Sequence, residues 1–217
     1  MKQALSTIAQ AAAVVSLTCS SLVHSASWDS GADYSITNNP NGEWSYNRKF
    51  AVTGTAADVM TVRWDSTGWY LGNFGHGGPS FYAGPHLWAK NNTNGYPALR
   101  WTTPAAGSYN ISGAFIGDDN RGVDNFVYVV VNGITAFTGR VTGYLDQESF
   151  AFNNLNLNAG DPVDFVLTWA GGVNSELGWT QASVQISAVP EVQTAWLIGL
   201  GLMTLALRRR LVGNAGA

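Results

Sequence analysis

The chain has 217 residues and a formal net charge of −3, but its charges are unevenly distributed. Between Ser27 and Glu191 there are 7 Lys and Arg residues against 14 Asp and Glu residues, a formal net charge of −7. An acidic surface repels nucleic acid and anionic lipid, so the composition excludes nucleic acid as a partner and suits an extracellular protein.

Residues 1–26 predict a secretory signal peptide. Lys2 gives the N-terminal region a weak positive charge, and an apolar run from Ile8 to Leu17 is followed by small residues. We expect cleavage after Ser25 or Ala26, and export of the rest. The only cysteine of the chain lies in the removed segment, so the exported protein has no disulfide.

Residues 27–188 predict one β-sandwich domain. Short runs of alternating apolar residues are separated by Gly, Asn and Pro, and no long window has helical spacing. Asn132-Gly133 between two such runs predicts a tight hairpin. The candidate strands are Val59–Trp64, Tyr109–Ile116, Phe126–Val131, Ile134–Thr138, Ser149–Phe152, Leu155–Leu157, Val163–Trp169 and Thr180–Ser187. About eight to ten strands without a helix predict an all-β fold, an antiparallel β-sandwich of the jelly-roll type.

Residues 65–97 are rich in both loops and aromatic side chains. Aromatic rings with polar tips suit wet binding sites and can stack on sugar rings. The predicted ligand-binding residues are Trp69, Tyr70, Tyr82 and Trp88. Large aromatic residues of a sandwich also serve as core, so the pattern leaves both roles open.

The segment 117–125 predicts either a calcium site or a turn. Its candidate ligands are Asp118, Asp119, Asn120 and Asp124. Calcium takes six to eight oxygen ligands, which such a loop can supply in part. Asp and Asn side chains also hydrogen-bond their own backbone in turns. No other cofactor is expected.

Catalytic motifs are sparse. After the signal peptide the only histidines are His76 and His86, and the sequence contains no Gly-x-Ser-x-Gly. A glycosidase needs two carboxylates across a cleft, and any acidic chain offers such pairs by chance. We therefore expect a non-enzymatic protein, with a carbohydrate-active enzyme that uses a carboxylate pair as the alternative.

The C-terminal segment 189–217 combines three features in a fixed order. Val189-Pro190-Glu191 precedes an uncharged apolar run, 195–207, and Arg208, Arg209 and Arg210 close that run. The run is shorter than the roughly 20 residues of a full membrane span. Arginines at its end match the cytoplasmic edge of a membrane helix.

This tail closely resembles the PEP-CTERM sorting tail of exported bacterial proteins. The resemblance implies a short membrane helix, transient residence in the inner membrane and cleavage near Pro190-Glu191 by an exosortase. Val192 stands where that family usually has a second proline. The alternative is a tail that stays in the membrane as a permanent anchor of a surface structural protein.

Three motifs of the domain resemble exported bacterial domains that carry this tail. They are Asn39–Tyr46, Ala106–Gly113 and Leu157–Phe165. The resemblance implies a galactose-binding-like sandwich, without a ligand or an activity. Together, the features predict an exported protein of the cell surface or extracellular matrix. Its expected role is either association with a biofilm matrix or binding of a surface polysaccharide.

Overall fold

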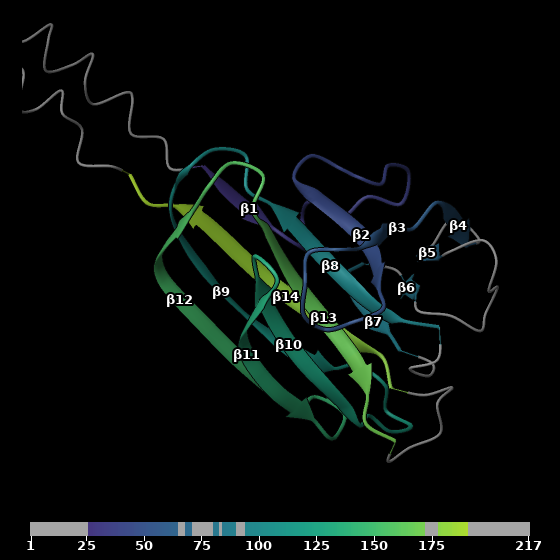
Figure 1. Cartoon of the computed structure of the whole chain (residues 1–217). Helices are drawn as coiled ribbons and strands as arrows, with labels where there is room; N and C mark the ends of the chain where they lie inside the picture. The colour runs from purple at the N-terminus through teal and green to yellow at the C-terminus, as the bar shows by residue number, and fades with distance from the viewer. Residues whose placement is uncertain are drawn as a thin grey trace, which may run out of the picture. The chain divides into compact units, whose positions relative to one another are not determined.

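The computed structural model describes residues 26–64, 68–70, 80–82, 84–89, 94–171 and 178–190. These residues form β-strands and no helix, and the strands make two antiparallel sheets (Figure 1). The expected all-β sandwich of the jelly-roll class is therefore confirmed. The signal peptide and the expected helix 195–207 lie outside the described residues. In the part of the chain that is described, nothing could cross a membrane as a helix.

The first sheet has the strand order β12-β9-β14-β7-β6-β5-β4, and β1 pairs with β14. Its strands are β1 (Ser27–Asp29), β4 (Val62–Trp64), β5 (Gly68–Tyr70), β6 (Ser80–Tyr82), β7 (His86–Trp88), β9 (Gly107–Gly117), β12 (Gln147–Leu157) and β14 (Thr180–Ala188). The second sheet has the order β11-β10-β13-β8-β2-β3. Its strands are β2 (Trp44–Lys49), β3 (Asp58–Val59), β8 (Tyr96–Thr102), β10 (Asn125–Val131), β11 (Ile134–Val141) and β13 (Pro162–Trp169).

The core lies between the two sheets, because every second residue of each long strand points inward. On β14, the inward Val184 and Ile186 are each 1% exposed, whereas the outward Ser183 and Gln185 are exposed. Aromatic residues fill much of this space. The aromatic core residues are Trp44, Tyr46, Trp69, Phe81, Trp101, Tyr109, Phe115, Phe150 and Phe165.

Several predicted elements match the structure closely. The Asn132-Gly133 turn joins β10 to β11, with φ of 48° and 83° at its two residues, as a tight hairpin requires. The two runs predicted at 149–152 and 155–157 form one strand, β12, with a register shift between Phe152 and Leu155. The run 59–64 is instead split into β3 and β4 around the buried Met60.

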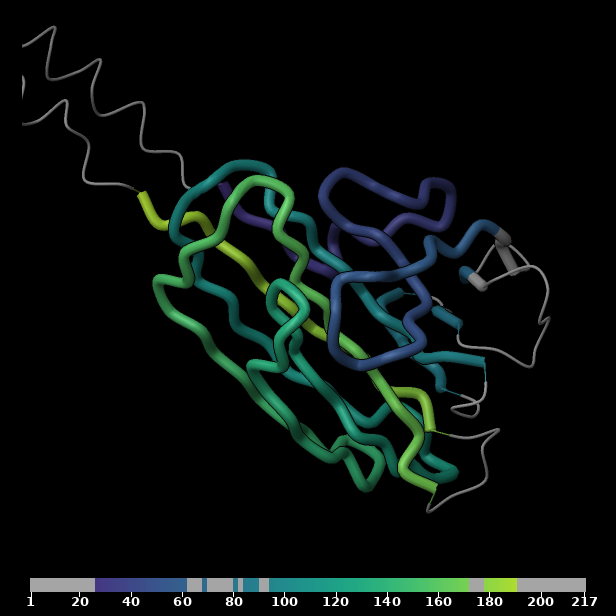
Figure 2. Tube along the Cα trace, viewed as in Figure 1, coloured from purple at the N-terminus to yellow at the C-terminus, as the bar shows by residue number. Residues whose placement is uncertain are grey.

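The chain enters and leaves the sandwich at the same end (Figure 2). The Ala188 N–H donates to the Ala26 carbonyl at 2.9 Å, so the first and last residues of the domain pair with one another. Ala26–Ala188 is a compact unit by itself. The loops 117–125 and 142–146 lie at the opposite end of the sheets, because β9 and β14 are antiparallel and pair Gly117 with Thr180.

Candidate functional site

The structure buries two of the predicted stacking aromatics. Trp69 is 5% exposed and Trp88 is 6% exposed. The Trp69 ring stacks on Tyr46 with a centroid distance of 6.1 Å, and its Nε1 donates to the Ser35 carbonyl at 2.7 Å. Trp88 stacks on Trp179 at 5.0 Å. Neither indole is an open platform, because β5 and β7 continue the first sheet over the core. The side chains of Tyr70 and Tyr82 lie outside the described part.

Exposed aromatic side chains occur in other segments. Phe50 is 63% exposed, Tyr144 is 54% exposed and Phe126 is 36% exposed. Phe50 carries the Arg48 guanidinium over its ring at 4.3 Å, and Phe126 carries that of Arg140 at 5.3 Å. Residues 65–97 were predicted to hold the ligand-binding aromatics because aromatic residues are dense there, but density alone does not separate core from surface.

The acidic loop 117–125 does not gather its carboxylates. Asp118 lies 2.6 Å from His86 Nδ1, Asp119 accepts from Arg121 at 2.9 Å, and Asp124 accepts from Arg140 at 2.8 Å. Each acid thus faces a different partner, and Asn120 is exposed. Within the described ranges, no group of three or more His, Cys, Asp or Glu residues could hold a metal ion. Asp119 and Asp124 pair with Arg121 and Arg140, and Asp118 lies next to the His86 imidazole. Calcium binding by this loop stays a prediction.

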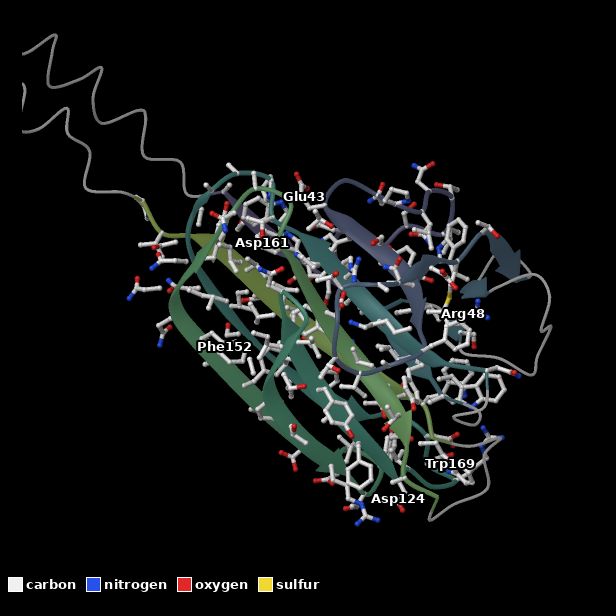
Figure 3. The ribbon with its side chains drawn as sticks, viewed as in Figure 1. Glu43, Arg48, Asp124, Phe152, Asp161 and Trp169 are labelled. Carbon is white, nitrogen blue, oxygen red and sulfur yellow. The ribbon has the colours of Figure 1, made fainter. Side chains whose placement is uncertain are left out.

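Asp119 shows how these carboxylates act. It is 4% exposed, and its Oδ2 also accepts the Gly178 N–H at 3.2 Å. The side-chain hydrogen bond from Arg121 lowers the pKa of Asp119, and the Arg121 and Gly178 backbone N–H groups lower it further. Asp124, which lies near Trp169 of β13 (Figure 3), pairs with Arg140 and fixes the end of the loop. Its acids have a structural function.

The second sheet carries a buried ionic cluster on its outer face. Lys49 Nζ donates to Asp164 Oδ2 at 2.6 Å, and Arg100 Nε donates to Asp164 Oδ1 at 2.6 Å. The loop 50–57, which we call the strap, crosses this face (Figure 2) and accepts from Lys49 and Arg100 through its Gly54 and Thr55 carbonyls at 2.7 Å. The Asp164 side chain is 1% exposed. Beneath the strap, this part of the face is closed, and the charges of Lys49, Arg100 and Asp164 are mutually satisfied.

An open polar pocket of about 600 Å³ lies at the edge of the sandwich. It is formed where the loop between β1 and β2 meets the break between β3 and β4. The lining residues are Thr37, Asn38, Asn39, Pro40, Asn41, Gly42, Met60, Thr61 and Trp69. None of them is charged, although the domain is acidic. The sequence could not reveal this pocket, because its two segments come together only through the fold.

Two asparagines hold the pocket wall in place. Asn39 Nδ2 donates to the carbonyls of Tyr46 and Met60, both at 2.8 Å, and Asn39 Oδ1 accepts the Tyr46 N–H at 2.9 Å. Asn39 thus bridges β2 to the break after β3. Asn41 Nδ2 donates to the Asp33 carbonyl at 2.9 Å. The wall is therefore rigid before any ligand binds.

The remaining polar groups of the pocket face solvent. Thr37, Asn38 and Thr61 are exposed, and they offer hydroxyl and amide groups that both donate and accept hydrogen bonds. Trp69 and Met60 add apolar surface at the base. A rigid wall, neutral hydrogen-bonding groups and a small apolar area suit a polar, uncharged ligand.

No protein-family model matches the chain, and no curated protein matches it. Among solved structures, a family 35 carbohydrate-binding module from Clostridium thermocellum has a TM-score of 0.31 and 12% identity, over 74% of this chain and 97% of that one. A CBM36-1 domain of a xylanase from the hindgut metagenome of Trinervitermes trinervoides has a TM-score of 0.33 and 11% identity, over 69% and 99%. CBM35 from Paenibacillus barcinonensis has a TM-score of 0.29 and 11% identity, over 76% and 99%. At these values the similarity carries no information about a ligand.

Proposed function

We propose that this chain is a non-enzymatic, exported protein of the cell surface or extracellular matrix that binds a neutral polysaccharide. The observation that supports it best is the uncharged, amide-lined pocket between Thr37 and Trp69. A sugar ring presents hydroxyl groups that donate and accept, so it matches the amide of Asn38 and the hydroxyls of Thr37 and Thr61. An anionic ligand would find no cation among the lining residues.

The pocket hypothesis is tested by removing one amide that the fold does not use. Asn38→Ala deletes a solvent-facing group, whereas Asn39 is needed for the wall. Asn120→Ala, at the other end of the sandwich, is the matched control. Affinity electrophoresis through gels containing xylan, galactomannan or dextran should show retardation of the wild type. In Asn38→Ala, the loss of about 1 kcal/mol of hydrogen-bond free energy should weaken binding roughly fivefold. Asn120→Ala should bind like the wild type. An unretarded wild type in every gel would refute the proposal.

Export and tail sorting complete the proposal. The last strand ends at Ala188, immediately before Val189-Pro190-Glu191, so a cut near Glu191 would remove no part of either sheet. An exosortase that cuts there would leave the domain intact, after transient residence of the tail in the inner membrane. The alternative, a permanent anchor, predicts a different product.

Intact mass measurement of the surface-located protein separates these two products. Sorting predicts a form that starts near Ala26 and ends near Glu191, without the apolar run. A surface form that still carries Arg208, Arg209 and Arg210 would show that the tail is a lasting anchor. The binding function would then stand, and the sorting step would be withdrawn.

A further inference from the structure

The outer face of the first sheet is almost free of charge. β9, β12 and β14, which lie side by side (Figure 1), contain a single charged residue, Glu148. Glu148 pairs with Phe115, whose side chain is in the core, so it belongs to the inward-facing set of β12. The outward positions of the three strands, all described, therefore carry no charge. This is unusual in a domain with a formal net charge of −7.

Hydroxyl and amide side chains form regular rows across this face. One row runs from Ala151 through Ser112 and Gln185 to Asp29, and the next holds Ser149, Ala114 and Ser183. Further rows hold Gln147, Ile116 and Gln181 on one side, and Asn110, Ser187 and Ser27 on the other. We call these outward positions of β1, β9, β12 and β14 the polar platform. At about 3.4 Å per residue and about 4.8 Å per strand, it measures roughly 20 Å by 14 Å.

A groove of about 330 Å³ crosses the platform near the chain ends. It is lined by residues of β1, β9 and β14, among them Ser27, Asn110, Ser112, Gln185 and Ser187. It shares no lining residue with the pocket between Thr37 and Trp69. The two sites can therefore be occupied independently.

Neighbouring side chains hold parts of the platform in place. Gln147 Nε2 donates to Ser149 Oγ at 2.8 Å, the Asn154 N–H donates to Asn110 Oδ1 at 3.0 Å, and Gln185 Nε2 reaches Asp29 Oδ2 at 3.3 Å. Asp29 is the one carboxylate that lines the groove. It pairs with Gln185 at an outward position of β1, and its Oδ1 accepts the N–H groups of its own turn. Among the described residues, the hydroxyls of Ser112 and Ser183 have no protein partner and face solvent.

The chemistry of the platform selects among ligands. Protein partners favour aromatic and Arg anchors, and the outward positions of β9, β12 and β14 contain neither. Nucleic acid and anionic lipid need cations, which are also missing from these positions. Apart from the Asp29 carboxylate of β1, the platform is a flat array of neutral donors and acceptors. Such an array fits the hydroxyl groups of an extended, uncharged sugar polymer.

We infer that the polar platform is a second polysaccharide-binding surface, which takes an extended stretch of a neutral polysaccharide. This inference rests on the proposed function and deepens it. A domain with two independent glycan sites joins two polymer chains, or two segments of one chain, and thereby gains avidity. The protein is then a cross-linker of its matrix.

The test places one negative charge on the platform. Ser183→Glu and Ser112→Glu change exposed strand residues that bury nothing, so both variants should keep wild-type stability within about 0.5 kcal/mol. Thr138→Glu, exposed on β11 of the other sheet, is the matched control. The probes are long galactomannan, whose solution viscosity reports cross-linking, and its short oligosaccharides, whose binding is measured by calorimetry.

We expect the wild type and Thr138→Glu to raise the viscosity of the galactomannan solution. With either platform variant, this increase in viscosity should be at least about tenfold smaller. Oligosaccharide binding in the pocket should persist in the platform variants and weaken in Asn38→Ala. A platform variant that cross-links like the wild type would overturn the inference. A wild type that binds oligosaccharide without raising viscosity would also overturn it, while the proposed function would stand. If the wild type binds neither probe, both the proposed function and the inference about the platform are wrong.

Discussion

The two outer faces of the sandwich differ sharply, although both arise from alternating strands. On the second sheet, the strap 50–57 covers part of the outer face, and beneath it Lys49, Arg100 and Asp164 satisfy one another. The face of the first sheet is open, and its outward positions on β9, β12 and β14 are neutral. The buried charges of the second sheet are thus structural, whereas β9, β12 and β14 present an uncharged surface that is available for recognition.

The largest effect is expected from breaking the ionic cluster. Lys49→Met should cost about 3–5 kcal/mol of unfolding free energy, because it leaves the Asp164 carboxylate buried with one cation fewer. Chemical denaturation of the full chain measures the change. The control is Asp58→Asn: the Asp58 side chain is 54% exposed in its pair with Arg48, and the change should cost at most about 1 kcal/mol. If Lys49→Met and Asp58→Asn lower the unfolding free energy by the same small amount, the buried ionic cluster stabilises the fold no more than an exposed ion pair does. The contrast between a structural face and an open face would then be wrong.

A moderate effect is expected from two glycines in comparable conformations. Gly54, in the strap, has a φ of 82°, and Gly42, in the pocket wall, has a φ of 57°. An added Cβ would contact nothing within 4 Å at either position, so Ala should cost only the backbone strain of about 1–2 kcal/mol.

Their consequences for binding should differ. Gly42→Ala should weaken polysaccharide binding, because Gly42 lines the pocket. Gly54→Ala should leave binding at the wild-type level and only speed amide exchange in the strap. If the strap variant loses binding as strongly as the pocket variant, the second sheet takes part in recognition.

The smallest effect concerns pH. The folded-state pKa of Asp119 is lowered, so its contribution to stability is present above its ordinary value of about 4 and is lost as pH falls below it. Asp119→Asn should therefore flatten the fall in melting temperature below about pH 4. Polysaccharide binding should stay constant between about pH 5 and 9, because no charged residue lines the pocket. A binding affinity that titrates in that range would place an ionisable group in the site.

Local patterns were enough to predict β9, β10, β13 and β14. Apolar and polar residues alternate along β9, β13 and β14, and the nearly continuous apolar run of β10 leads into the Asn132-Gly133 turn. β1, β2 and β8 were missed, and so were β5, β6 and β7, which lie in the segment 65–97 that was expected to be rich in loops. β2 ends in Arg48 and Lys49, which look exposed until the strap and Asp164 cover Lys49. β8 contains Pro97 and Arg100, which argue against a central strand in isolation. Their burial depends on contacts far along the chain.

The same limit applies to the candidate site. The aromatic density around Trp69 and Trp88 was correctly noticed, but their ring partners are far along the chain. Tyr46 is on β2 and Trp179 directly precedes β14, so burial could not be anticipated. The acidic loop 117–125 has a ligand-rich composition, yet Arg140 and His86 reach it from elsewhere. Composition identified the kinds of group present, and only the fold determined which groups are free.

Hydrogen–deuterium exchange of the full chain, with and without long galactomannan, shows where the polymer binds. We expect protection by the polymer in two places, at residues 37–42 and 60–61 of the pocket and in β1, β9 and β14 of the platform. We expect no change in the strap 50–57 or in the β10–β11 hairpin. Protection confined to the strap and that hairpin, with none in the pocket or on the platform, would contradict this expectation.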